Sequence, residues 1–161
     1  MQRPYPVPEH LSPNRRHAAM LIGSYSGRVS ELTAINQYVY HHLALERTHP
    51  DIAHALRDIA VQEMHHLDML GSCIRDLGMR PKFVHFAGRS QRFWSAGFVV
   101  YGKTPREMLE ADKRAEYAAI AQYERLVRQL GDSRIEALLK RMIEDEYEHI
   151  AILDHLLQHV K

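Results

Sequence analysis

The chain contains the same short pattern twice, and this duplication limits what it can fold into. Residues 31–38 read ELTAINQY and residues 116–123 read EYAAIAQY. Each copy is followed, at nearly the same distance, by a glutamate and a histidine three residues apart, at positions 63–66 and 146–149. Because residues three, four and seven apart share one face of a helix, the pattern predicts two copies of one helical hairpin.

Apolar residues recur at three- and four-residue steps along almost the whole chain, which is typical of amphipathic helices. Ser12 and Pro13 match the start of a helix, and Gly23 and Gly27 mark a candidate interruption within it. The periodicity predicts four helices, at about residues 12–45, 51–77, 104–130 and 132–160.

The segment between the second and third helices sets the expected topology. Residues 79–104 contain scattered glycine, proline and aromatic residues, and only residues 97–102, GFVVYG, have strand-like character. The other links are short, which favours antiparallel neighbours. We therefore expect an all-α four-helix bundle at residues 12–161, made of two helical hairpins joined by a long crossover and preceded by an extended segment at residues 1–11.

Composition excludes several functional classes. The formal net charge of +1 argues against general affinity for nucleic acid, and no apolar run approaches the ~20 residues that a membrane span needs. The single cysteine, Cys73, excludes an internal disulfide and a Cys-x-x-Cys metal site. Because the first residues lack the apolar stretch of a secretory signal, we expect a cytoplasmic protein without nucleic-acid or membrane partners.

Four glutamates interrupt the predicted core-facing stripes, and their burial needs an explanation. A buried carboxylate is costly unless it is paired, and four together would repel one another. Two divalent cations would balance their charge; the alternative is a set of buried ion pairs with arginine or histidine and no metal. The candidate metal ligands are Glu31, Glu63, His66, Glu116, Glu146 and His149.

The donor types indicate which metals fit. Carboxylates with one imidazole per ion and no thiolate suit iron or manganese, although zinc or cobalt can bind the same groups. Tyr38 and Tyr123 follow the leading glutamates by two helical turns on the same face, within reach of hydrogen bonds to carboxylates across the bundle. The alternative is that both tyrosines are core aromatics.

In the order of these motifs the chain resembles the ferritin-like di-iron carboxylate superfamily. ELTAINQY, EMHH and DEYEH are most similar to its bacterioferritin and rubrerythrin branch. The resemblance covers most of the chain and implies a ferritin-like four-helix bundle. It also implies that Glu31 and Glu116 are terminal carboxylates and that Glu63 and Glu146 are bridging carboxylates. The nitrogen ligands implied by the resemblance are His66 and His149.

The chain departs from that branch in three respects. It ends soon after Glu146, without the short fifth helix of ferritins and bacterioferritins, so we do not expect a cage-forming iron store. It lacks the cysteine-rich rubredoxin module of rubrerythrins, so a peroxidase cycle would need an external electron donor. Ala119 stands where rubrerythrins carry an additional glutamate, and the nearest acid upstream, Asp112, is either an outer group of the site or a solvated charge.

Four further residues have two interpretations each. Met64 matches a haem-ligating methionine that bacterioferritins share across a dimer axis, but a methionine at such a position more often packs at an interface, so we do not expect haem. Asp145 and Gln62 each precede a predicted histidine ligand by one turn, and each either orients an imidazole or is an exposed polar residue. His42 is expected to be a core or rim histidine.

Together, the motifs and the resemblance predict a dinuclear metal oxidoreductase that reacts with peroxide or dioxygen in peroxidase- or ferroxidase-like chemistry. We expect two iron ions, with manganese as the alternative, and Fe(II) as either cofactor or substrate. The alternatives are a non-catalytic protein that sequesters iron or manganese and a dimanganese, catalase-like enzyme. A homodimer is expected, with Gly23, Gly27 and the aromatic crossover as candidate contact surfaces.

Overall fold

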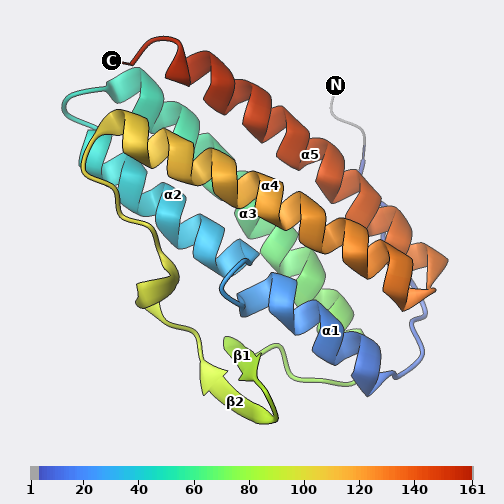
Figure 1. Cartoon of the computed structure of the whole chain (residues 1–161). Coiled ribbons are helices and arrows are strands. Elements are labelled where there is room, and N and C mark those ends of the chain that lie inside the picture. The colour runs from blue at the N-terminus through green and yellow to red at the C-terminus, as the bar shows by residue number, and fades with distance from the viewer. Residues whose placement is uncertain (1–3, 161) are drawn as a thin grey trace.

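The computed structural model describes residues 4–160 (Figure 1). In chain order, the elements are α1 (Arg15–Ser26), α2 (Glu31–Leu45), α3 (Pro50–Asp76), β1 (Val84–Ala87), β2 (Ser90–Phe93), the 3-10 turn η1 (Ala96–Phe98), α4 (Pro105–Leu130) and α5 (Ser133–Leu157). The helices form a bundle, which confirms the predicted all-α class. None of the helices described is long and apolar enough to span a membrane.

The first predicted helix consists of two helices in the structure. α1 begins later than Ser12 because the Asn14 side chain caps its first turn. The chain leaves the helical conformation at Gly27 and re-enters it at α2, whose N-cap is Ser30. A β-carbon at Gly27 would lie 2.4 Å from the carbonyl oxygen of Gly23, so this path requires glycine. The interruption predicted at the two glycines is therefore present, at Gly27.

Two antiparallel helix pairs make up the bundle. α2 packs mainly against α3, and α4 mainly against α5. Figure 1 shows the connection between α3 and α4 running along the outside of the bundle from one end to the other. Thr104 caps α4 by accepting a hydrogen bond from the Glu107 amide at 3.2 Å, and Gly131 ends it in the left-handed conformation. Both predicted hairpins and the predicted crossover are confirmed.

The predicted position of extended structure in the crossover is wrong. The strands are β1 and β2, which pair antiparallel with His85 opposite Arg92, whereas residues 97–102 contain the end of η1 and an irregular stretch. Gly88, at the tight turn between the strands, has a φ of 63°, which glycine adopts without strain. Because these strands are short and largely exposed, they leave no apolar alternation in the sequence.

The core has two apolar clusters separated by a polar layer. One cluster contains Leu21, Leu70 and Leu138 and lies toward α1. The other contains Leu56 and Leu109 and lies toward the opposite end of the bundle. Along α3, α4 and α5 alike, the buried acidic residues and histidines lie between these clusters. The apolar ends therefore enclose a polar site in the middle of the bundle.

Candidate metal centre

The six residues predicted to bind metal lie together in this polar layer. Each is at most 3% exposed. Their side chains form two groups of four, and within each group one ligand atom per residue lies within 4.8 Å of the others. The first group is Glu31, Glu63, His66 and Glu146, and the second is Glu63, Glu116, Glu146 and His149.

Helix geometry explains this convergence. On α3 and on α5, the glutamate and the histidine are three residues apart and therefore share one face. Glu31 is the first residue of α2, directly after the break. Its N-cap, Ser30, accepts a hydrogen bond from the Thr33 amide at 3.2 Å, so the start of α2 fixes the direction from which Glu31 enters the site.

Two carboxylates, Glu63 and Glu146, belong to both groups. Nδ1 of His66 lies 2.9 Å from Glu63 and 3.3 Å from Glu146. Nδ1 of His149 lies 3.0 Å from Glu146 and 3.2 Å from Glu63. This near-symmetric arrangement puts each shared carboxylate between two imidazoles, as a carboxylate bridging two ions would be.

Protons neutralise part of the cluster when no cation does. Burial, reinforced by the charges of Glu63 and Glu146, raises the pKa of Glu31 well above its usual value. The same causes raise the pKa of Glu116. These two carboxyl groups, each a member of one group only, therefore favour the protonated form in the metal-free protein.

The histidines carry protons for a different reason. Burial lowers the pKa of His66, but the charge of Glu146 and hydrogen bonds to nearby carboxylates outweigh it and raise the pKa well above normal. The pKa of His149 is raised in the same way, against burial, by the carboxylates of Glu116, Glu146 and Glu63, which lie 3.5, 3.0 and 3.2 Å from its Nδ1. Burial would raise the pKa of Glu63, but the nearby imidazole of His149 and the hydrogen bond from His66 hold it below its usual value.

Several buried polar atoms at the centre have no hydrogen-bond partner among residues 4–160. They are Oε1 of Glu31, both carboxylate oxygens of Glu146 and both ring nitrogens of His149. Some lie within ion-pair distance of one another but lack the geometry of a hydrogen bond. Buried orphan groups are rare and costly. Converging oxygen and nitrogen donors of this kind fit two divalent cations, and the absence of thiolate from the set suits iron or manganese.

Asp145 has a role across the bundle rather than along its own helix. Its Oδ2 lies 3.1 Å from Nε2 of His66 on α3, and it also pairs with Arg141. Burial would raise the pKa of Asp145, but hydrogen bonds, first from His66, lower it to about 2. Asp145 is therefore ionised and orients the histidine of the other hairpin. The structure therefore contradicts the interpretation that Asp145 is exposed, and the imidazole that Asp145 orients is not that of His149 on its own helix.

The N-terminal segment reaches this arrangement through Tyr5, which the sequence did not single out. The Tyr5 hydroxyl donates a hydrogen bond to Asp145 at 2.7 Å, and Gln62 donates to the same hydroxyl at 3.4 Å. The Arg141 guanidinium lies 4.8 Å from the centre of the Tyr5 ring. Gln62 thus contacts Tyr5 and not the histidine one turn after it. No spacing rule relates Tyr5 to residues so distant in the chain.

The two predicted tyrosines differ in their contacts. Tyr38 donates a hydrogen bond to Oε1 of Glu116 across the bundle. Tyr123 is equally buried, but its hydroxyl has no hydrogen-bond partner within the part of the chain described, and its ring packs in the apolar cluster near α1. A hydrogen bond to a site carboxylate is thus found for Tyr38 and not for Tyr123.

Asp112 is fully buried and is not a solvated charge. Both of its oxygens lie 2.9 Å from Nδ1 of His41, and Gln37 donates to one of them at 2.9 Å. Nε2 of His41 lies 2.9 Å from the carbonyl oxygen of Val100 in the crossover. The neighbouring His42 is at the rim, with Nδ1 2.9 Å from the Ala53 carbonyl oxygen. His41, rather than His42, therefore links the buried Asp112 to the crossover, and the spacing of the predicted metal ligands gave no indication of this.

Two further sequence features lie outside the centre. Met64 is 45% exposed, although it directly follows the buried Glu63, because successive residues of a helix point in different directions. Gly27 is buried, and a β-carbon at Gly23 would contact Gln122 of α4 at 3.6 Å. Gly27 therefore packs inside the chain, and the expectation that it belongs to a dimer surface is wrong, whereas Gly23 is half-buried and stays a candidate contact.

Comparison with known proteins gives matches along nearly the whole chain. Residues 29–161 match the family model for the ferritin-like domain. A bacterioferritin from Mycobacterium leprae is 33% identical over 129 residues, 78% of this chain and 75% of the relative. A 3-demethoxyubiquinol 3-hydroxylase from Bordetella parapertussis is 30% identical over 158 residues, 92% of this chain and 68% of the relative.

A solved structure is similar over almost the same length. The crystal structure of KatB, a manganese catalase from Anabaena, superposes with a TM-score of 0.84 and 25% identity, covering 99% of this chain and 80% of that one. The matches agree with a bundle whose middle contains two groups of carboxylates and histidines suited to binding metal ions. The chain therefore belongs to the ferritin-like di-iron carboxylate superfamily, as the order of its motifs predicted.

Proposed function

We propose that the protein is a dinuclear metal oxidoreductase that binds two iron ions and reacts with peroxide or dioxygen. The observation that supports this most directly is the sharing of Glu63 and Glu146 between two ligand groups in the middle of the bundle. Carboxylates shared in this way hold two ions close together, where both can act on one small molecule.

Charge supports the same proposal. Each ligand group contains three carboxylates and one imidazole, and the two groups together contain four glutamates. Two divalent cations neutralise four ionised glutamates, so the loaded cluster no longer carries the penalty of buried like charges. In the metal-free protein, protons on Glu31, Glu116 and the histidines neutralise only part of this charge.

In this proposal each side chain has a defined task. Two bound iron ions would supply electrons to the oxidant. Asp145 holds Nε2 of His66, which directs Nδ1 toward the carboxylates, and Tyr38 holds Glu116. With two ions bound, Glu31 and Glu116 would be terminal ligands of one ion each, Glu63 and Glu146 would be shared by both ions, and His66 and His149 would be the nitrogen ligands.

A dimanganese, catalase-like enzyme is the second candidate. It is favoured by the similarity to the manganese catalase KatB over 99% of the chain, and the donor set suits manganese as well as iron. A catalase releases dioxygen from peroxide without another reductant, whereas a peroxidase needs an external electron donor and a ferroxidase consumes Fe(II). A sequestration protein does none of these.

These reactions separate in one set of assays. Protein loaded with iron, and separately with manganese, is given hydrogen peroxide with and without ascorbate, while peroxide and dioxygen are both followed. The proposal predicts peroxide consumption by the iron form that depends on the donor and is lost in Glu63→Ala. Dioxygen release by the manganese form alone favours the catalase. Bound metal that never changes oxidation state contradicts both enzymes.

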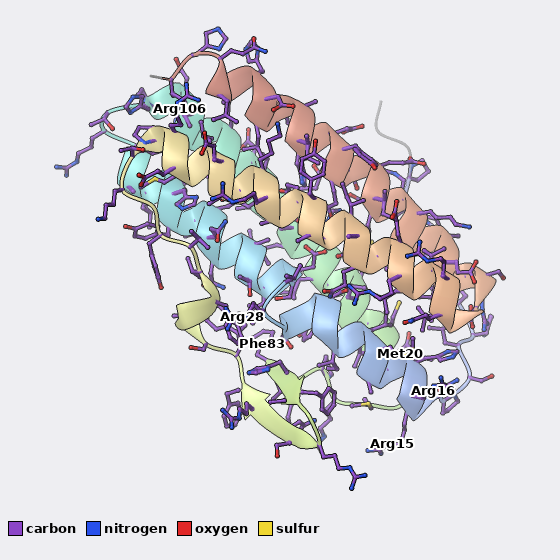
Figure 2. All side chains as sticks on the ribbon, viewed as in Figure 1. Arg15, Arg16, Met20, Arg28, Phe83 and Arg106 are labelled. Atoms are coloured by element: carbon purple, nitrogen blue, oxygen red, sulfur yellow. The ribbon has the colours of Figure 1, made fainter. Side chains whose placement is uncertain are left out.

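The proposed setting is a cytoplasmic homodimer that receives electrons from a separate donor. The β-hairpin offers exposed aromatic side chains for a contact between two copies, since Phe83 is 49%, Phe86 43% and Phe93 82% exposed. Figure 2 shows Phe83 beside this hairpin. Light scattering at several protein concentrations measures the mass directly, and a monomer at micromolar concentration contradicts the dimer.

A further inference from the structure

A cavity of about 250 Å³ lies against the metal centre. It is enclosed by the break between α1 and α2, by α4 and by the crossover, and its lining includes Glu31, Glu63 and Glu116. At about 30 Å³ per water molecule, it has room for roughly eight small non-hydrogen groups. Peroxide and dioxygen contain far fewer atoms, so the cavity is larger than the proposed oxidants require.

The walls of this cavity are mostly apolar. Ala111, Ala115 and Ala119 follow one another at four-residue steps and form a stripe of small side chains along α4. Phe98 and Val100 of the crossover also line the space. Small residues on a helix leave room, and aromatic and aliphatic walls favour the hydrocarbon part of a ligand.

Several polar side chains in the walls are already engaged by the chain itself. Gln122 donates hydrogen bonds to Ser24 at 2.7 Å and to the carbonyl oxygen of Val29 at 3.1 Å. The Thr33 hydroxyl donates to the Gly27 carbonyl oxygen at 2.9 Å. These contacts satisfy the wall groups near the break, whereas two other lining residues, Tyr123 and Glu31, each have an oxygen atom without a hydrogen-bond partner among residues 4–160. The body of a ligand therefore meets few polar groups that demand a partner.

The crossover wall is held rigidly in place. The Val100 amide donates to Gln37 at 2.9 Å, and its carbonyl oxygen lies 2.9 Å from Nε2 of His41. Gln37 and His41 are both bonded to the buried Asp112. Both polar backbone groups of Val100 are thus fixed by one buried network, and a preformed wall lowers the entropic cost of binding.

Two arginines, Arg28 and Arg114, line the cavity and are exposed to solvent. The Arg28 guanidinium lies 4.8 Å from the centre of the Phe98 ring, which holds the charge beside the cavity. Figure 2 shows Arg28 at the break between α1 and α2, on the side facing the crossover. Within residues 4–160, neither arginine has an ion-pair partner, whereas Arg134 pairs with Asp132 at 2.7 Å.

We propose that this cavity binds a small organic carboxylate. Arg28 and Arg114 hold its carboxylate at the mouth, because guanidinium groups recognise carboxylates through paired hydrogen bonds. Its hydrocarbon body lies along the alanine stripe and ends beside Glu31 and Glu116. Its closeness to two metal ions rests on the proposed function, whereas binding itself depends only on the cavity and the arginines.

The single tryptophan provides a measurement that does not depend on metal chemistry. Nε1 of Trp94 donates a hydrogen bond to Thr33 at 2.9 Å, and Thr33 lines the cavity. Octanoate is titrated into the metal-loaded protein while tryptophan fluorescence and binding heat are recorded, with octanol as the uncharged probe of equal chain length. We expect a saturable change with octanoate and binding of octanol that is weaker by about tenfold or more.

Variants test the two ends of the ligand separately. Arg28→Gln and Arg114→Gln should each weaken octanoate about tenfold and leave octanol unchanged. The control is Arg125→Gln, because Arg125 is an exposed arginine on α4, like Arg114, but does not line the cavity. This variant should change the affinity for neither probe. Ala115→Leu should weaken both probes because it fills the space. Circular dichroism checks that each variant folds. If Ala115→Leu does not fold, the arginine variants still decide the test.

The outcomes distinguish this inference from the proposed function. Protein that holds two metals and consumes peroxide but shows no saturable octanoate binding overturns the inference and leaves the function intact. Octanoate binding by protein that retains no metal supports the inference while contradicting the function. Equal affinity for octanoate and octanol, or octanoate binding that both arginine variants leave unchanged, shows a merely apolar cavity and overturns the carboxylate.

Discussion

Oδ2 of Asp145 on α5 lies 3.1 Å from Nε2 of His66 on α3, so a carboxylate of one hairpin orients a histidine of the other. With Nε2 engaged in this way, Nδ1 faces Glu63 and Glu146. His149 has no such partner, because its Nε2 is without a hydrogen bond within the residues described. The two ligand groups therefore contain the same kinds of residue, but only the histidine of the first group is oriented by a carboxylate outside the group.

Asp145→Asn should therefore weaken one metal position more than the other. The amide cannot accept from His66 with the strength of a carboxylate, and losing such a partner typically lowers metal affinity by about 10- to 100-fold. Titration of metal-free protein with Fe(II) under anaerobic conditions should show two tight equivalents in the wild type and one in the variant. Glu148→Gln, an exposed acid on the same helix, is the control. Equal weakening of both positions would contradict the asymmetry.

Tyr5→Phe should produce a smaller effect in the same direction. The variant keeps the ring beside Arg141 but removes the hydroxyl that donates to Asp145. One hydrogen bond contributes about 0.5–1.5 kcal/mol, so metal affinity should fall by up to roughly tenfold. In the Asp145→Asn background, Tyr5→Phe should have little further effect, which a double-mutant cycle measures. Full additivity would show that Tyr5 does not act through Asp145.

Tyr38 and Tyr123 form a matched pair for a stability measurement. Tyr38→Phe removes the hydroxyl bonded to Glu116 and leaves a buried carboxyl oxygen without a partner, at a cost of about 1–3 kcal/mol in the free energy of unfolding. Tyr123→Phe removes a hydroxyl that makes no bond in the described structure and should change stability by much less. Urea unfolding of the metal-free proteins compares them, and equal losses would argue against the Tyr38 contact.

The stabilisation that metal provides should increase with pH. The pKa values of Glu31, Glu116, His66 and His149 are raised, so above about pH 4.5 the folded, metal-free protein holds more protons than the unfolded chain and loses stability as pH rises. Glu63, whose pKa is lowered, affects stability only at more acidic pH. Bound cations displace the extra protons.

The measurement is the difference in Tm between metal-loaded and metal-free protein, taken at several values between about pH 5.5 and about pH 8. The difference should grow steadily across this range as protons are released more easily to metal. A constant or shrinking difference would mean that the cluster does not hold these protons.

The chain sequence predicted the parts that depend on spacing along one helix. Glu63 with His66 and Glu146 with His149 share a face because they are three residues apart, and the structure brings both pairs together. The fold class followed from the same periodicity. The break at Gly27 was visible as a glycine inside a helical pattern.

Contacts between distant segments could not be predicted in this way. Whether Asp145 faces His66 or His149 depends on the relative rotation and axial offset of α3 and α5, which neither helix encodes alone. Tyr5 meets the same carboxylate from a segment without periodicity. His41 and His42 are adjacent and chemically identical in sequence, and only the packing of the crossover shows that His41 is buried. Such choices are made by tertiary packing rather than by local propensity.

The most direct test of the dinuclear centre is the metal content of protein purified from a metal-replete source, compared with Glu63→Ala and Glu146→Ala. Both substitutions remove a carboxylate that belongs to both ligand groups. We expect about two iron or manganese ions per wild-type chain and loss of both in either variant, since each shared carboxylate supports two ions. A folded wild type that holds no stoichiometric metal under replete conditions, or variants that keep both ions, would contradict this expectation.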